Sequence, residues 1–316
     1  MQQLVEDLMS GSRRAAARLI SLVENDAPLK RELLKEIFPH TGKAYVIGVT
    51  GAPGSGKSSL VDCLLQQMRA DDLKIGVIGV DPTSPFSGGA ILGDRIRMQE
   101  HALDRDIFIR SMGTRGSLGG LARATREAIQ VLDAFGKDVV LIETVGVGQS
   151  EVDIVRTADS TMVVLTPAGG DSVQTIKAGI MEIADIFVIN KADLPGAERT
   201  ATEINMMLDM KESDQWRPPV LSAVSVRSEG IGAVWDCLKD HRRFMEESGR
   251  LMEIRRERVR RELTEQVEYL VKNRIWDQVK EQIELESLLE KIVLRREDPY
   301  SAAYELLEQI NFYSEG

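Results

Sequence analysis

The sequence from Ala44 to Ser58 reads Ala-Tyr-Val-Ile-Gly-Val-Thr-Gly-Ala-Pro-Gly-Ser-Gly-Lys-Ser and joins an apolar run to a glycine-rich loop. Residues 44–50 are apolar and β-branched, as in a buried strand, and 51–58 match G-x-x-x-x-G-K-[ST]. Residues 59–65 continue with apolar side chains at helical spacing. In a strand, loop and helix of this order, the loop N–H groups and the positive end of the helix dipole face the same anion. The stretch therefore predicts a phosphate-binding P-loop.

A second motif, Asn-Lys-Ala-Asp at 190–193, closes the apolar run 186–189. The carboxylate of Asp193 would accept guanine N1–H and the exocyclic amine, and adenine lacks that pair of donors. A mismatched base would leave the carboxylate unpaired, at a cost of about 1–3 kcal/mol or more. Alone, the first motif is compatible with a glycine-rich surface turn and the second with a loop that begins a helix, but both follow predicted strands. The ligand is therefore predicted to be GTP or GDP.

Short apolar runs alternate with amphipathic stretches through the middle of the chain. This alternation predicts an α/β fold: a P-loop NTPase with a doubly wound, mostly parallel sheet, flanked by helices and extended by helices at both ends. The expected organisation is an N-terminal helical extension over 1–40, a GTPase domain over 41–245 and a C-terminal helical dimerisation arm over 246–316. The runs expected to be strands are 44–50, 75–80, 107–110, 139–143, 161–166, 186–190 and 219–222.

Helical spacing governs both ends of the chain. One N-terminal helix is expected to include Leu4, Leu8 and residues 13–20, and a second to span residues 29–38. In the C-terminal arm, acidic and basic residues interleave from Arg255 onward and apolar residues recur at helical intervals. That pattern favours solvated faces of amphipathic helices over a nucleic-acid site. We therefore expect the arm to pack in a homodimer.

Composition bounds the class of protein. The chain has 316 residues, 43% of them hydrophobic, a formal net charge of −10 and a mean hydropathy of −0.16. These values indicate a globular protein without nucleic acid as a partner. No apolar run is long enough to cross a membrane. The acidic N-terminus lacks the basic and apolar regions of a signal peptide, and Cys63 and Cys237 fit buried thiols in a reducing compartment. The expected location is the cytoplasm.

Hydrolysis of GTP needs a phosphate cradle, a metal ion and a positioned water. Lys57 can reach the β- and γ-phosphates, and the Ser58 hydroxyl can ligate Mg²⁺. The run 139–143 ends in Glu143, where small GTPases have Asp. Gly146 can donate its N–H to the γ-phosphate, which would make 146–156 a segment ordered by GTP.

A proline- and glycine-rich loop over 81–95 follows the second predicted strand. Its Asp81 and Asp94 are candidates for the water shell of Mg²⁺ or for orienting the attacking water, and a helix-cap or turn role is the alternative for each. Val147 follows Gly146, so the water-orienting Gln of Ras-like enzymes is missing there, and Gln149 is the nearest substitute. Slow intrinsic turnover, raised by a partner, is the expected consequence.

The predicted contacts form two sets. The predicted Mg²⁺ ligands are Ser58, Asp81, Asp94 and Glu143. The predicted nucleotide contacts are Gly51, Ala52, Pro53, Gly54, Ser55, Gly56, Lys57, Ser58, Ser59, Gly146, Asn190, Lys191, Asp193, Ser222, Ala223 and Val224, the last three because their backbone can face guanine O6.

The segments 51–58, 81–98, 143–151 and 190–193 together resemble the MeaB/ArgK family, the GTPases associated with methylmalonyl-CoA mutase. The likeness spans essentially the whole chain, and 81–98 is its most specific part. It implies a homodimeric G-protein chaperone that gates delivery of adenosylcobalamin to an acyl-CoA mutase and protects that mutase from inactivation.

The resemblance also assigns roles to individual residues. Asp81, Asp94 and Glu143 fall where the family has its magnesium-site acids. Gln174 and Lys177 fall in its third switch, within residues 169–177, and Gln149 is a further switch candidate. The residues expected to take part in catalysis are Lys57, Asp81, Asp94, Glu143 and Lys177.

Three other readings stay open. A metallochaperone GTPase for hydrogenase or urease assembly has a similar core, but the cysteines and histidines of this chain are isolated and predict no metal cluster. A kinase for arginine or a transport protein would need an acceptor site, and Asp193 disfavours ATP. The third alternative is a scaffold that binds GTP without hydrolysing it, and only a measured rate of hydrolysis distinguishes it from a GTPase. The sequence contains no Asp-x-His-x-x-Gly pattern, which would have predicted directly bound cobalamin. It also does not identify the partner mutase.

Overall fold

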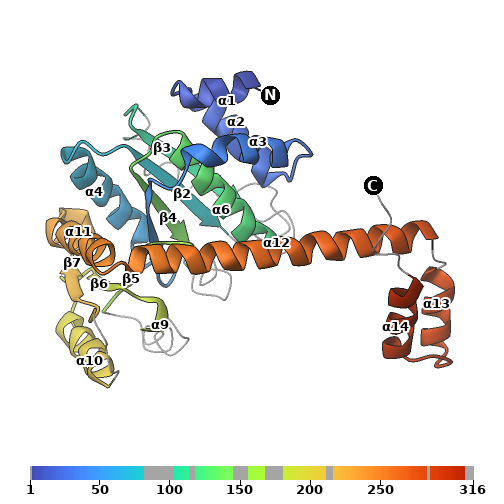
Figure 1. Cartoon of the computed structure of the whole chain (residues 1–316). Coiled ribbons are helices and arrows are strands. Elements are labelled where there is room, and N and C mark those ends of the chain that lie inside the picture. The colour runs from blue at the N-terminus through green and yellow to red at the C-terminus, as the bar shows by residue number, and fades with distance from the viewer. Residues whose placement is uncertain are drawn as a thin grey trace. The chain divides into compact units, whose positions relative to one another are not determined.

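The computed structural model describes residues 2–81, 101, 103–113, 118–144, 156–167, 181–210, 216–282 and 285–309. Within them a seven-stranded sheet forms the centre of the fold, in the order β3-β2-β4-β1-β5-β6-β7 (Figure 1). Every neighbouring pair is parallel, which confirms the doubly wound α/β prediction. The strands are β1 (Tyr45–Thr50), β2 (Ile75–Asp81), β3 (Ile107–Gly113), β4 (Val139–Thr144), β5 (Ser160–Leu165), β6 (Ile186–Asn190) and β7 (Val220–Ala223).

The position of β1 explains where a ligand can bind. From β1 the chain runs outward to β2 and β3 on one side, returns to β4 beside β1, and then continues through β5 to β7 on the other side. In open parallel sheets such a reversal leaves a crevice at the carboxyl ends of the strands. The glycine-rich loop that follows β1 lies at this crevice.

Helices cover both faces of the sheet. On one face α4 (Lys57–Ala70) and α11 (Ile231–Glu247) pack over Tyr45 and Ile47. On the other face α2 (Arg13–Glu24) and α6 (Leu118–Ala134) pack with Val46 in a second core. α10 (Ala197–Asp209) covers β5 and β6 in a third. Because both faces are buried, the strands read as continuous apolar runs.

The N-terminal helices differ in number from the expectation. Two were expected, but the structure has α1 (Gln2–Met9), α2, α3 (Lys30–Ile37) and the short 3-10 helix η1 (Phe38–His40). Gly11 takes a φ of 90°, and the Ser12 hydroxyl accepts the Ala15 N–H at 3.3 Å. A left-handed glycine followed by a capping serine ends one helix and begins the next.

A polar chain of four side chains lies at the amino-terminal ends of the strands, opposite the glycine-rich loop, with three members buried and Asp185 partly exposed. Tyr45 Oη and Ser160 Oγ are 2.6 Å apart, and Ser160 Oγ lies 2.6 Å from His241 Nδ1. His241 Nε2 lies 3.5 Å from Asp185 Oδ1, and the Thr161 N–H donates to the other carboxylate oxygen at 2.7 Å. This polar chain joins the first residues of β1 and β5 to the middle of α11, between side chains that are otherwise apolar.

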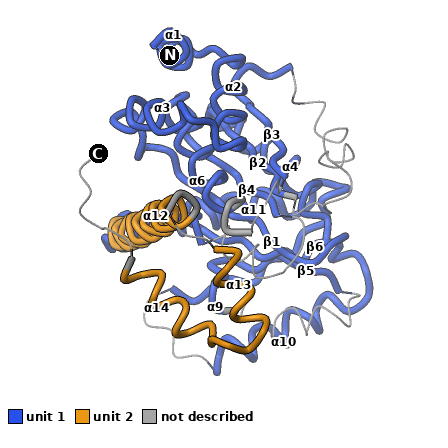
Figure 2. The backbone as a smooth tube through the Cα atoms, turned by 90° about the vertical axis from the view of Figure 1, so that its right-hand side faces the viewer, with its two compact units in different colours: residues 1–251 blue, residues 252–316 orange. Residues whose placement is uncertain are grey.

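The chain divides into two compact units, residues 1–251 and 252–316 (Figure 2). Unit 1 holds the sheet and its helices, together with the short α9 (Met181–Ile183). Unit 2 contains most of α12 (Arg250–Gln282), followed by α13 (Leu285–Val293) and α14 (Pro299–Gln309). In the part of the chain that the structure describes, no helix combines the length and the apolarity needed to cross a bilayer.

Candidate functional site

The glycine-rich loop joins β1 to α4 in a conformation that requires glycine. Gly51 has a φ of 146°, and a Cβ there would lie 2.1 Å from the carbonyl oxygen of Val164, near the end of β5. Gly56 has a φ of 86°, and a Cβ there would lie 2.3 Å from Asn190 Nδ2. Other residues pay a steric cost in this left-handed region, and here the space is also filled. The loop therefore lies directly against both β5 and the second sequence motif.

Lys57 is the first residue of α4 and is 6% exposed. Its Nζ donates to the carbonyl oxygens of Gly51 at 2.8 Å and Ala52 at 3.1 Å. The ammonium is thus held inside the loop rather than extended into solvent. A lysine in this position places a point charge where phosphate oxygens would enter the loop.

Ser55 places a buried hydroxyl in the loop. It is 1% exposed, and among the described residues its Oγ has no hydrogen-bond partner. A buried hydroxyl without a partner costs about 1–3 kcal/mol, so such groups in a folded protein call for an explanation. A phosphate oxygen bound in the loop would supply the missing acceptor.

Ser58 and Glu143 form the candidate metal site. Ser58 Oγ donates to Glu143 Oε1 at 2.5 Å, and the Glu143 side chain is 4% exposed. The parallel register pairs Val49 with Glu143, which brings the end of β4 beside the end of β1. A hydroxyl and a carboxylate are the hard oxygen ligands that Mg²⁺ prefers, and Mg²⁺ usually takes its other ligands from phosphates and water. The donor set therefore fits Mg²⁺ without further protein ligands.

Asn190 and Lys191 tie the second motif to the loop. Asn190 is fully buried, and its Nδ2 donates to the Ser55 carbonyl oxygen at 2.9 Å and to that of Gly56 at 3.4 Å. Its Oδ1 accepts the Ser225 N–H at 3.2 Å. Lys191 has a φ of 57°, and its Nζ donates to the Gly54 carbonyl oxygen at 2.8 Å. The two motifs therefore form one hydrogen-bonded assembly.

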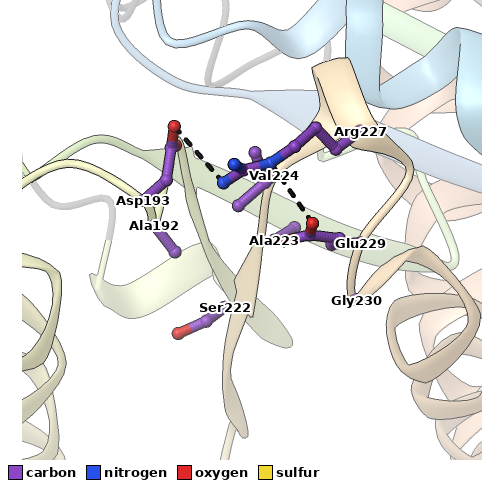
Figure 3. Close-up of a pocket in the computed structure, with 8 residues that line it drawn as sticks. All are labelled: Ala192, Asp193, Ser222, Ala223, Val224, Arg227, Glu229 and Gly230. Carbon is purple, nitrogen blue, oxygen red and sulfur yellow. Dashed lines mark ion pairs between the residues drawn. The ribbon is translucent and has the colours of Figure 1, made fainter.

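A pocket of about 260 Å³ opens beside this assembly (Figure 3). The predicted base contacts Asp193, Ser222, Ala223 and Val224 line it. Its remaining lining residues are Ala192, which belongs to the second motif, and Arg227, Glu229 and Gly230, which lie outside the sequence motifs. Arg227 belongs to the 3-10 helix η4 (Ser225–Arg227), directly after β7. The pocket and the loop together provide separate places for a base and for phosphates.

The structure brings together only part of the predicted site. Ser59 lies in the first turn of α4, next to Ser58. The backbone of Asp81 ends β2 at the same edge of the sheet, opposite Gly113 of β3. In the described residues, no group of three or more His, Cys, Asp or Glu side chains could hold a metal ion. The predicted residues that lie outside the described part of the chain are Asp94, Gly146, Gln149, Gln174 and Lys177.

Comparison with known proteins points to one family. A family model described as methylmalonyl Co-A mutase-associated GTPase MeaB matches residues 16–281. A protein of Pyrococcus abyssi named as a GTPase is 53% identical over 315 residues, which cover 98% of this chain and 97% of that protein. The GTPase ArgK of Escherichia coli is 36% identical over 285 residues, 87% of this chain and 86% of that protein.

Two further comparisons agree. The methylmalonic aciduria type A homolog, mitochondrial, of Mus musculus is 37% identical over 270 residues, 79% of this chain and 65% of that protein. A crystal structure of a LAO/AO transport system kinase superposes with a TM-score of 0.71 at 29% identity, covering 97% of this chain and 96% of that one. With a P-loop, a pocket lined by the predicted base contacts and this likeness along most of its length, the protein is a GTPase, and it belongs to the family of methylmalonyl-CoA mutase-associated GTPases called MeaB.

Proposed function

We propose that this GTPase is a G-protein chaperone that gates adenosylcobalamin loading of an acyl-CoA mutase such as methylmalonyl-CoA mutase and protects that mutase. The observation that carries the proposal is the family match over residues 16–281, because the family is described by its association with methylmalonyl-CoA mutase. The name of the mouse relative points to the same metabolism. A GTPase influences a partner through loops that differ between its GTP and GDP states.

The proposed phosphate and metal roles follow from the contacts of the loop. On GTP binding, the Lys57 ammonium exchanges its carbonyl contacts for β- and γ-phosphate oxygens. Ser58 and Glu143 would hold Mg²⁺, with Asp81 and Asp94 proposed for its water shell. When bound, Mg²⁺ supplies the charge that neutralises the β- and γ-oxygens during transfer.

The proposed base and switch roles complete the site. Asp193 accepts the two donors on the guanine edge, and the backbone of 222–224 faces guanine O6. Gly146 is proposed to sense the γ-phosphate. Gln149, Gln174 and Lys177 are proposed to transmit the nucleotide state to the mutase, with Lys177 also acting in catalysis, as the family resemblance implies. Turnover is expected to be slow until the partner orders these segments.

A homodimer in the cytoplasm is the proposed working form. Exposed apolar side chains recur on α12 at Val259, Leu263, Val267 and Leu270, at helical spacing and with 51–65% of their area exposed. An apolar stripe on a long helix is suited to packing against a second copy. The net charge of −10 disfavours nucleic acid and anionic membranes as partners. No site for cobalamin itself is proposed on this chain.

Steady-state hydrolysis of GTP tests the proposal, with and without a purified adenosylcobalamin-dependent mutase of the same organism. We expect the mutase to raise the GTP rate at least about tenfold, as partner activation does in other GTPases. ATP should stay unhydrolysed, and Lys57→Ala should remove the activity in both conditions. In parallel, transfer of adenosylcobalamin to the apo-mutase, followed by its absorbance, should depend on GTP.

Two outcomes would redirect the assignment. A GTP rate that no mutase changes, with transfer independent of nucleotide, would remove the proposed partner and favour a metallochaperone role. Tight GTP binding without any turnover, alone or with the mutase, would leave a nucleotide-dependent scaffold.

A further inference from the structure

Three charged side chains cross the base pocket in a row (Figure 3). Arg227 Nη2 lies 3.5 Å from Asp193 Oδ2, and Arg227 Nε lies 3.2 Å from Glu229 Oε1. All three residues line the same pocket. The guanidinium therefore connects the carboxylate proposed to recognise guanine with the carboxylate of Glu229, two residues further along the same turn.

The backbone that carries Arg227 is fixed on several sides. Val224 and Glu229 pair through N–H···O bonds of 3.0 and 3.3 Å, which closes the loop between them. The Arg227 N–H donates to the Val224 carbonyl oxygen at 3.0 Å. At the start of the loop, the Ser225 N–H donates to Asn190 Oδ1, and Cys63 Sγ of α4 donates to the Ser225 carbonyl oxygen at 3.2 Å. Arg227 thus projects from a rigid base toward Asp193.

We propose that Arg227 is a positioning residue for guanine recognition, with Glu229 holding its guanidinium. This inference rests on the proposed role of Asp193. An ionised carboxylate has about four lone-pair sites, and the two donors of a guanine edge use one on each oxygen. Arg227 Nη2 lies 3.5 Å from Oδ2, longer than a strong charge-assisted hydrogen bond, so both oxygens keep a site for the base. The ion pair and the base contacts are therefore compatible, and the guanidinium fixes the rotamer in which both oxygens face the base.

Electrostatics favours the same arrangement. Without Arg227 the pocket would contain the carboxylates of Asp193 and Glu229 and no cation among its lining residues. Two neighbouring carboxylates repel each other and disfavour an anionic nucleotide. A lysine at this position keeps the charge but lacks the fork that contacts two carboxylates at once.

Binding of GDP and of IDP to the full chain with Mg²⁺ tests the inference, since inosine lacks the 2-amino group that the second carboxylate oxygen accepts. For Arg227→Ala we expect affinity for GDP to fall about fivefold and affinity for IDP to change less than about twofold. Arg227→Lys should recover part of the loss, and Glu229→Gln should produce a smaller loss in the same direction. Arg217→Ala is the matched control, because Arg217 is an exposed arginine paired with Asp209 and does not line the pocket.

The possible outcomes distinguish a failure of this inference from a failure of the proposed role of Asp193. If Arg227→Ala binds GDP as tightly as the parent, Arg227 does not position Asp193, and tighter binding would show that Arg227 competes with the base for Asp193; either result overturns the inference. Equal losses for GDP and IDP would also overturn it, because they would show a general effect on the pocket. Asp193→Asn is the separate test: an unchanged ratio of GDP to IDP affinity in that variant would sink the guanine assignment itself.

Discussion

Single side chains decide whether the nucleotide site is assembled. Asn190 fixes the loop through Ser55 and Gly56 on one side and the turn after β7 through Ser225 on the other. Its sequence context predicted a role at the base, whereas the contact with the loop follows from the tertiary fold. Arg227 was missed for a related reason. It lies outside the four-residue motif and enters the pocket through a turn whose shape the sequence does not specify.

Replacing Asn190 tests this link between the two motifs. Asn190→Ala leaves the Ser55 carbonyl oxygen and the Ser225 N–H without their partner in a buried place. We expect the free energy of unfolding to fall by about 2–4 kcal/mol and affinity for GDP to fall at least about tenfold. Urea unfolding and nucleotide titration measure the two effects. Asn205→Ala, which removes a bond to the Ala201 carbonyl oxygen and an exposed one from Arg217, should change neither by much.

Gly51 offers a second test at the same scale. Gly51→Ala directs a methyl group at the Val164 carbonyl oxygen, so loop or strand must move. We expect a loss of about 2–4 kcal/mol in unfolding free energy together with weaker GTP binding. Gly42 also has a positive φ, but nothing lies within 4 Å of a Cβ there. Gly42→Ala should therefore cost only about 1 kcal/mol, from the backbone alone. Equal losses in the two variants would contradict the steric argument.

At the amino-terminal ends of the strands, polar side chains hold a helix against the sheet. At the amino-terminal edge, the Tyr45–Ser160–His241–Asp185 chain locks α11 to β1 and β5. Burial raises the pKa of Asp185 to about 7, although the Thr161 N–H opposes the shift. Burial, with a smaller effect of Arg250, lowers the pKa of His241 to about 4. Folding thus favours the neutral form of both groups.

These shifts make a prediction about pH. Between about pH 4 and pH 6.5 the unfolded chain carries a proton on His241, whereas the folded chain carries one on Asp185. The number of bound protons is equal, so the pair contributes no slope to stability in this window. From pH 6.5 to about pH 7 only the folded chain holds the proton, and stability falls as pH rises.

Asp185→Asn removes the group that binds the proton in the folded chain. The remaining His241 binds its proton only in the unfolded chain, so the unfolding free energy of the variant, relative to the parent, should rise from pH 4.5 to pH 6.5. Urea unfolding at several pH values measures the difference. Asp236→Asn, at an exposed carboxyl on α11, serves as the control. A difference independent of pH for Asp185→Asn would show that the two groups do not titrate as described.

The elements themselves were largely predictable, and the polar chain was not. Each apolar run expected to be a strand overlaps a strand of the structure, and the ends differ by three residues at most. The runs were recognisable because strands buried on both faces have continuous apolar sequences. His241 and Asp185 carry no such signal. They are isolated in sequence, and only the packing of α11 on the sheet brings them together.

Across the whole molecule, the two units differ in how they bury apolar surface. Unit 1 contains three cores, whereas in unit 2 the buried apolar residues among those described are Val279, Leu288 and Ala302. A helix as long as α12 with an exposed apolar stripe gains stability when the stripe is covered. The C-terminal composition predicted helices, but it does not specify what covers the exposed stripe.

The oligomeric state of the protein tests whether a second copy covers the apolar stripe of α12. We expect the full chain to be a dimer by light scattering after size-exclusion chromatography. Leu263→Glu with Val267→Glu should shift it toward monomer, because each charge would be buried against the partner. Met206→Glu places the same charge on an exposed apolar position of α10 in unit 1 and should leave the mass unchanged. A parent chain that is already monomeric would refute the dimer.

The central place of β1 has a consequence for how the protein is made. The strand that leads into the nucleotide loop pairs with residues 139–144 and 160–165, and the loop is completed by contacts from Asn190 and Ser225. A ribosome therefore translates the loop long before it translates the segments that hold it in shape, and such distant pairing is slow to form. A nascent chain that stops short of residue 225 should not retain GTP. Capture of the nucleotide would then mark the completion of the domain during synthesis.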